Sequence, residues 1–146
     1  ITTMKRVLSS VLATVMMLAC CFSTASAAAT TTLRASETIT NRIVSLNEGT
    51  RSGEVVVTFM VTAKKTASQI GVSSIKIYKA NGTLVSTITG TTANNLIGSS
   101  TITKNGHYTY KGVAGTSYYA EVVIFATIGQ NTDSRVITTK TVTAPV

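Results

Sequence analysis

The sequence predicts an all-β fold, an antiparallel β-sandwich of about seven strands. From Ala28 on, the chain is rich in Thr, Val and Ile, whose β-branched side chains suit a pleated sheet. No segment shows an apolar stripe with the period of a helix. Turn-forming residues recur about every ten residues, a spacing typical of short strands joined in antiparallel order.

The N-terminal segment, residues 1–27, has the three parts of a secretory signal peptide, which we expect to be helical. In order these are the basic start Met4-Lys5-Arg6, the mostly apolar run 7–22 and the small residues Ala25-Ser26-Ala27. We take Met4 as the true start and expect cleavage between Ala27 and Ala28. The apolar run is too short and too interrupted for a permanent transmembrane segment. The protein is therefore expected to be secreted, either into the medium or in association with the cell surface.

A competing interpretation of the same segment is a lipoprotein. Met17-Leu18-Ala19-Cys20 resembles a bacterial lipoprotein box, in which Cys20 would become the lipidated N-terminus and anchor the protein. Cleavage before Ala28 would remove both cysteines, Cys20 and Cys21, and leave none in the mature chain. No disulfide can then stabilise the domain, which must be held together by its own core.

The charge balance is basic, with 13 Lys and Arg against 5 Asp and Glu in the whole chain. Loss of Lys5 and Arg6 with the leader lowers this excess, and the remaining basic residues are dispersed. Dispersed positive charge favours loose electrostatic association with an anionic cell wall. A nucleic-acid partner is not expected, because the sequence has no basic run and no recognition-helix pattern.

We expect a flexible lead-in over 28–36 and a single sandwich domain over 37–146. Strands are expected over 37–46, 54–63, 74–79, 83–88, 107–111, 117–128 and 133–143. The segment 64–71 is predicted to be a loop or a short helical turn, and 90–100 a long loop. The clearest core strand is 54–63, because its apolar side chains alternate onto one side: Val55, Val57, Phe59, Val61 and Ala63.

Two Asn-Gly pairs predict tight turns, since this dipeptide readily adopts positive φ angles. Asn81-Gly82 would join 74–79 to 83–88 in a hairpin, and Asn105-Gly106 would form a second turn. In the first hairpin Ile75 and Ile77 are expected to point inward, and Lys76 and Tyr78 outward.

The C-terminal part resembles the last hairpin of a fibronectin type III or related immunoglobulin-like domain. The resemblance lies in Gly115-Thr116-Ser117-Tyr118-Tyr119-Ala120-Glu121-Val122-Val123-Ile124, then Gly129-Gln130-Asn131 and the strand 136–142. It implies that Tyr118 is a corner tyrosine, with a buried ring and a hydroxyl bonded to backbone. The sequence departs from the family where a core Trp is expected and Ile75, Ile77 and Tyr78 stand instead.

The leader, together with segments 73–82 and 108–115, also resembles small secreted proteins of gut Firmicutes. This second resemblance implies a habitat and no particular activity.

Residues capable of catalysis or metal binding are few. His107 beside a turn is expected to be a surface residue, and Asp133 is explained by turn chemistry in its hairpin. Alternation places Glu54 and Glu121 on the outer faces of opposite sheets, too far apart for a catalytic pair. No ligand spacing for a metal and no cofactor motif is present, so we expect a protein that is not an enzyme and needs no cofactor.

A candidate binding patch is predicted on the outer face of 117–128. Its residues are Lys76, Tyr78, Tyr119, Glu121 and Phe125, with Val123 beside them. Aromatic side chains rimmed by charge suit a protein or glycan partner. The alternative is ordinary cross-strand packing, or cover by the N-terminal segment or the 90–100 loop.

The function expected from these features is an exported, non-enzymatic binding, adhesion or structural module at the cell surface or in the medium. The alternative is a secreted inhibitor or toxin-like effector, which the two predicted loops 64–71 and 90–100 would favour.

Overall fold

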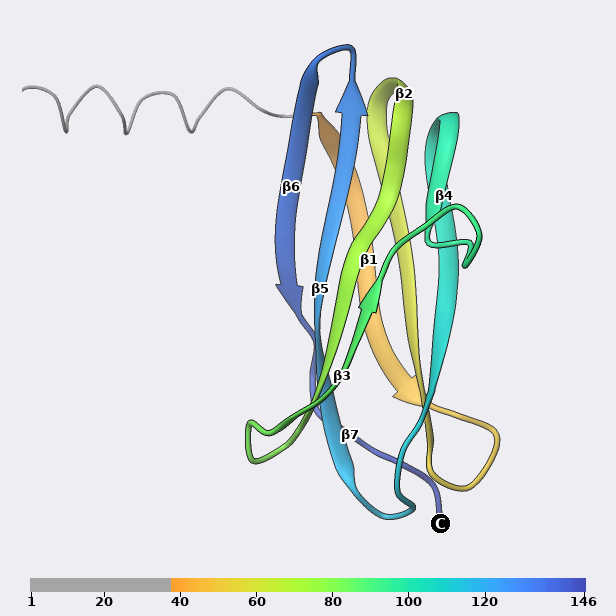
Figure 1. Cartoon of the computed structure of the whole chain (residues 1–146), viewed down its shortest axis with the longest axis vertical. Helices are drawn as coiled ribbons and strands as arrows, with labels where there is room; N and C mark the ends of the chain where they lie inside the picture. Colours follow the sequence, from red (N-terminus) through yellow and green to blue (C-terminus); the bar gives the residue numbers. More distant parts are fainter. Residues whose placement is uncertain (1–37) are drawn as a thin grey trace, which may run out of the picture. The chain divides into compact units, whose positions relative to one another are not determined.

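The computed structural model describes residues 38–146, which form seven β-strands and no helix (Figure 1). The strands are β1 (Ile39–Glu48), β2 (Glu54–Lys79), β3 (Leu84–Thr89), β4 (Ile97–Lys111), β5 (Ser117–Ile128), β6 (Asn131–Thr138) and β7 (Val142–Thr143). The predicted signal peptide with its start at Met4, its cleavage site and Cys20, and the 28–36 lead-in, lie outside the described residues.

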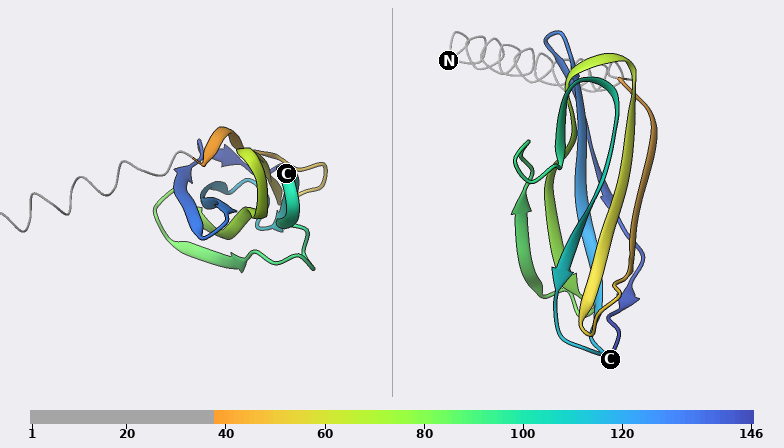
Figure 2. Two further views of the ribbon diagram at one scale, coloured as in Figure 1. Left: turned by 90° about the horizontal axis from the view of Figure 1, so that it is seen from above. Right: turned by 90° about the vertical axis from the view of Figure 1, so that its right-hand side faces the viewer.

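All the strand pairs are antiparallel, and hydrogen bonds join the seven strands into one sheet. The order along its main path is β1-β2-β5-β6, while β3 and β4 also pair with β2, and β7 pairs with β5. Seen along its length, the sheet curls so that the strands surround the interior (Figure 2). The predicted all-β, antiparallel class is therefore confirmed.

The longest strand, β2, has two arms that meet at a bend over 64–66. Its first arm pairs with β1 and with the second half of β4, and its second arm pairs with the first half of β4 and with β3 and β5. The prediction of a loop or helical turn over 64–71 was wrong. Lys64, Lys65 and Thr66 are exposed, but the next residues re-enter the sheet because Ala67 and Ile70 are fully buried. This arrangement also removes one of the two loops that favoured an inhibitor or effector.

The second predicted turn, Asn105-Gly106, was also wrong. Both residues lie within β4 and pair with Met60 and Phe59 of β2. Gly106 is needed for space rather than for a turn, because a Cβ atom there would lie 2.9 Å from Cζ of the Phe59 ring. β4 also begins at Ile97, so it takes up the end of the loop predicted over 90–100.

The remaining predicted strands are close to those observed. β5 has the predicted bounds, and Gly82, with φ of 89°, forms the turn between β2 and β3. The last predicted strand, 133–143, is divided into β6 and β7. The first begins and ends two residues later than expected, at Ile39 and Glu48.

The core is built from the inward residues of β2 and β5. The five apolar residues predicted to share one side of 54–63 are all buried, as are Ile75 and Ile77. An irregularity in the β2–β5 pairing between Val72 and Ser74 keeps the inward side continuous, since it changes which residues of β2 face the core.

The prediction that Tyr118 has a buried ring and a hydroxyl bonded to backbone is confirmed. Its ring is buried, and its hydroxyl accepts a 2.9 Å hydrogen bond from the backbone N–H of Val113. Tyr110 packs edge-on against it, with ring centroids 5.5 Å apart.

Candidate binding surface

The centre of the candidate surface is a pair of tyrosines from two neighbouring strands. Tyr78 of β2 lies directly opposite Tyr119 of β5. Their rings stack, with centroids 5.1 Å apart and planes 9° from parallel. Both rings are half-buried, so a flat aromatic surface is partly open to solvent. Stacked aromatic pairs of this kind hold each other in place.

A carboxylate and an amine lie next to the tyrosine pair. Glu121 faces Lys76 across the same two strands, and the Tyr78 hydroxyl donates a 3.2 Å hydrogen bond to Oε2 of Glu121. Burial raises the pKa of the Tyr78 hydroxyl, and the hydrogen bond to Glu121 and its negative charge raise the pKa further. Tyr78 is therefore held as a neutral donor, and its orientation is set by Glu121.

Phe125 was predicted to be part of the exposed patch, and the structure corrects this. Its side chain is only 9% exposed, although it does not belong to the inner core cluster. Its partners across the sheet are Gly71 and Ser134, of which the first has no side chain and the second a small one. The small residues opposite Phe125 leave space beside its ring, which accounts for its burial.

The pairing of the strands adds two residues that the sequence reasoning missed. Leu84 of β3 lies opposite Tyr78 and is 48% exposed, and Val136 of β6 lies opposite Val123 and is 66% exposed. Directly opposed residues share a face of a sheet. We define the outer-face patch as Lys76, Tyr78, Leu84, Tyr119, Glu121, Val123 and Val136. Strand pairing, which the alternation pattern does not reveal, was needed to find the two flanking residues.

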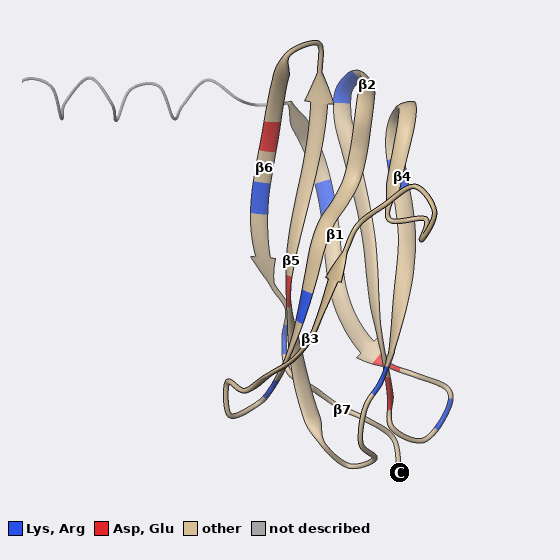
Figure 3. Cartoon of the chain, viewed as in Figure 1, with Lys and Arg blue, Asp and Glu red and all other residues tan. Residues whose placement is uncertain are grey.

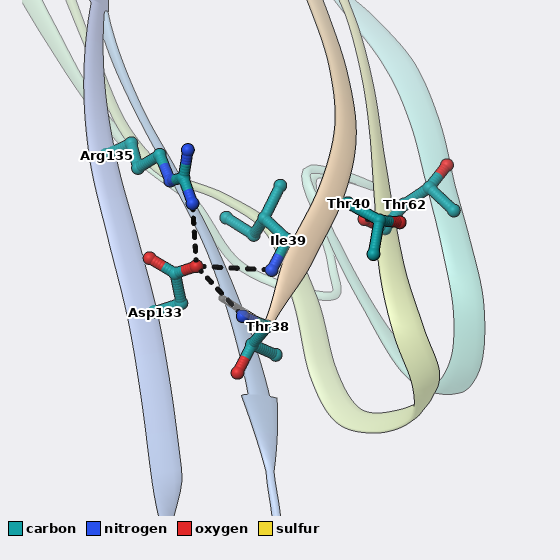
Figure 4. Close-up of polar contacts among 6 residues, drawn as sticks. All are labelled: Thr38, Ile39, Thr40, Thr62, Asp133 and Arg135. Atoms are coloured by element: carbon teal, nitrogen blue, oxygen red, sulfur yellow. Dashed lines mark hydrogen bonds and ion pairs between the residues drawn. The ribbon is translucent and has the colours of Figure 1, made fainter. Parts of the chain in front are cut away.

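Asp133 has a role that differs from the one predicted. It is not in the turn but in β6, and it is buried. Its Oδ2 atom accepts hydrogen bonds from the backbone N–H groups of Thr38 and Ile39, at 3.2 and 3.1 Å (Figure 4). The same oxygen lies 3.2 Å from Nη2 of Arg135. Asp133 thus joins the start of β1 to β6, which are at opposite ends of the strand order.

The Asp133 carboxyl is held in its charged form. Burial by itself raises its pKa, but the hydrogen bond and charge of Arg135 and the N–H groups of Ile39 and Thr38 outweigh that effect. The pKa of Asp133 is consequently below its ordinary value of 3.8.

The other titratable residues singled out from the sequence are separate from one another in the sheet. His107 is exposed, but it lies within β4 opposite Thr58 rather than beside a turn. Glu54 starts β2 opposite Lys111, whereas Glu121 is in β5. Within residues 38–146, no three His, Cys, Asp or Glu side chains are grouped as metal ligands. That same part of the chain also has no helix long and apolar enough to cross a membrane.

Comparisons with known proteins do not identify a family for this chain. No family model matches the chain, and no curated protein matches it. Among solved structures, the chain is similar to a family 76 glycoside hydrolase from a bovine Bacteroides thetaiotaomicron strain, with 15% identity, 69% of this chain covered and a TM-score of 0.39. The chain spans 20% of the length of that hydrolase. This likeness is too weak to carry a fold family or an activity over to the chain.

Proposed function

We propose that this chain is an exported binding module that is not an enzyme and that uses the outer-face patch to hold a protein or glycan. The main support for the proposal is that the central side chain of the patch, Tyr78, is held in a fixed position. Tyr78 is held by two residues of β5, since its ring stacks on the Tyr119 ring and its hydroxyl donates a hydrogen bond to Glu121. A pre-ordered aromatic surface loses little conformational entropy on binding, which favours affinity.

The chemistry of the patch suits sugars and polar protein surfaces alike. Tyrosine rings offer apolar area together with a hydroxyl, and such residues are enriched at binding interfaces. Lys76 and Glu121 lie opposite each other at one side of the rings and supply a donor and an acceptor. Leu84 and Val136 extend the apolar area toward β3 and β6. The partner is therefore expected to present an apolar face with polar groups at its rim.

Export is proposed from the leader sequence, and it places the patch outside the cell. Retention at the cell surface would then be non-covalent, by attraction of the basic domain to an anionic cell wall, unless Cys20 is lipidated. Charge attraction of that kind is screened by salt. A high-salt wash should release a non-covalently held protein and leave a lipidated one in place.

We also propose that the curled sheet works as an immunoglobulin-like sandwich. The two arms of β2 support this, because only the first pairs with β1 and only the second pairs with β3 and β5, while β4 follows both arms. The buried Tyr118 with its backbone hydrogen bond fits the same architecture. In such a sandwich the outer-face patch would belong to a single layer.

Binding by the patch is tested with a matched pair of variants and a third variant, Tyr119→Ser. Leu84→Ser changes a patch residue that is 48% exposed, and Ile102→Ser changes a residue of β4 that is 49% exposed and outside the patch. Each purified variant is applied to a glycan array and to the surface of the producing cells. Leu84→Ser and Tyr119→Ser should lose most of the binding, while Ile102→Ser keeps it. Equal binding by all three variants, or equal loss, would exclude the patch as the binding surface.

A further inference from the structure

A second feature of the molecule is a pocket of about 510 Å³ at the end of the sheet where Asp133 joins β1 to β6. Its lining comes from three strands, of which β6 is distant in sequence from β1 and β2. The lining residues are Ile39, Thr40, Arg42, Lys64 and Arg135. Arg42 comes from β1, Lys64 from the bend of β2, and Arg135 from β6 (Figure 3 shows basic segments at these places). None of these strands could form the pocket alone.

The pocket carries an excess of positive charge. Three of its five lining residues are cationic, and within residues 38–146 the one ion pair is that between Arg135 and Asp133. Arg135 uses Nη2 for that contact, which leaves other N–H groups of its guanidinium for a ligand. Counting Asp133, the group has a net charge of about +2. Like charges around one hollow repel each other, so this arrangement is relieved when an anion enters.

We propose that this pocket binds a phosphate group in its doubly charged form. Arginine donates paired hydrogen bonds to phosphate oxygens, and lysine adds a point charge. A phosphate monoester carries about −1.5 to −2 charges at neutral pH and so matches the net charge of the site. A single carboxylate, with one negative charge, would neutralise only half of it. Asp133 acts here as a positioning residue, because it fixes both Arg135 and the start of β1.

The proposal is independent of the outer-face patch, since none of the patch residues lines the pocket. Binding of phosphate in this pocket also differs from loose electrostatic attraction of the protein to the cell wall. Binding by dispersed charge depends on the total charge of the protein, whereas binding in a pocket depends on the particular residues that line it. Variants that remove one positive charge, either inside or outside the pocket, distinguish binding in the pocket from binding by the total charge.

The experiment uses the whole chain, expressed and purified in the form that the cell makes. Inorganic phosphate is titrated at constant ionic strength and followed by NMR or calorimetry. Arg42→Gln and Lys64→Gln are each expected to weaken binding at least about tenfold, which corresponds to about 1.4 kcal/mol. Their matched controls are Arg51→Gln and Lys111→Gln, which remove the same charges from exposed positions outside the pocket. These controls should stay within about twofold of the unchanged chain.

Three results would overturn the proposal. They are equal weakening by the control variants, no measurable binding of phosphate, and binding of acetate as tight as that of phosphate. Methyl phosphate should bind like inorganic phosphate, and dimethyl phosphate, with one charge, more weakly.

The source of the phosphate is identified by comparing inorganic phosphate with glucose 6-phosphate. Tighter binding of the sugar phosphate indicates a glycan-borne group, while equal or weaker binding indicates the free ion; either result supports the pocket. Leu84→Ser should keep the affinity for phosphate. Failure of the patch and failure of the pocket are therefore distinguishable.

Discussion

Two carboxylates of this protein accept side-chain contacts of equal length, yet their surroundings give them different roles. Glu121 lies 3.2 Å from the Tyr78 hydroxyl, and Asp133 lies 3.2 Å from Nη2 of Arg135. Glu121 is half-buried on the outer face, and its partner comes from the neighbouring strand. Asp133 is buried and also accepts two backbone N–H groups from β1. Burial and the number of hydrogen-bond partners, rather than distance, determine how much each carboxylate contributes to stability.

The largest effect is expected from removal of the buried carboxylate. Asp133→Ala leaves the N–H groups of Thr38 and Ile39 and the charge of Arg135 without their partner. The free energy of unfolding should fall by about 3 kcal/mol. Chemical denaturation measures this, with Glu121→Ala as the comparison variant. A loss as small as that of the comparison variant would show that the link between β1 and β6 contributes little in solution.

The pH dependence of stability should follow the same carboxylate. Its pKa is lower in the folded chain than the ordinary value of 3.8, so the folded state binds its proton less readily than the unfolded state. The stabilisation is therefore present above about pH 4 and is lost as the pH falls through the folded pKa. Denaturation over an acid pH series should show a decline that is smaller in Asp133→Asn. Identical declines in the two proteins would assign the acid sensitivity to other groups.

The smallest effect is expected on the outer face. Glu121→Gln removes the charge that helps to raise the pKa of Tyr78, so this pKa should move back toward its ordinary value of 10.0. Stability at neutral pH should change by no more than about 0.5 kcal/mol, as for other surface substitutions. In alkali, the unchanged chain should lose stability as the pH rises through the Tyr78 pKa, and the variant should lose less. Tyrosinate absorbance gives the pKa, with Glu48→Gln as the control; equal titrations would contradict the Tyr78–Glu121 contact.

The binding surface could be predicted only in part, because some of its features depend on the local sequence and others on partners from distant strands. Alternation along 74–79 and 117–128 was enough to place Lys76, Tyr78, Tyr119 and Glu121 on one face, because the side-chain period of a strand is local. It did not show that Phe125 is buried, since that depends on the small residues opposite it in β2 and β6. Leu84 and Val136 likewise became part of the surface only through their register with Tyr78 and Val123.

The sequence by itself determined the strand-rich class, the bounds of β5, the hairpin at Gly82 and the inward side of 54–63. All of these follow from the order of apolar, polar and turn-forming residues within a few positions. Only the tertiary structure decided the bend of β2 at 64–66 and the course of β4 through Asn105-Gly106, since an extended chain continues where a neighbouring strand accepts its hydrogen bonds. The tertiary structure alone also brought Asp133 to Thr38, 95 residues away. A contact of that range depends on how the sheet curls, which no local pattern records.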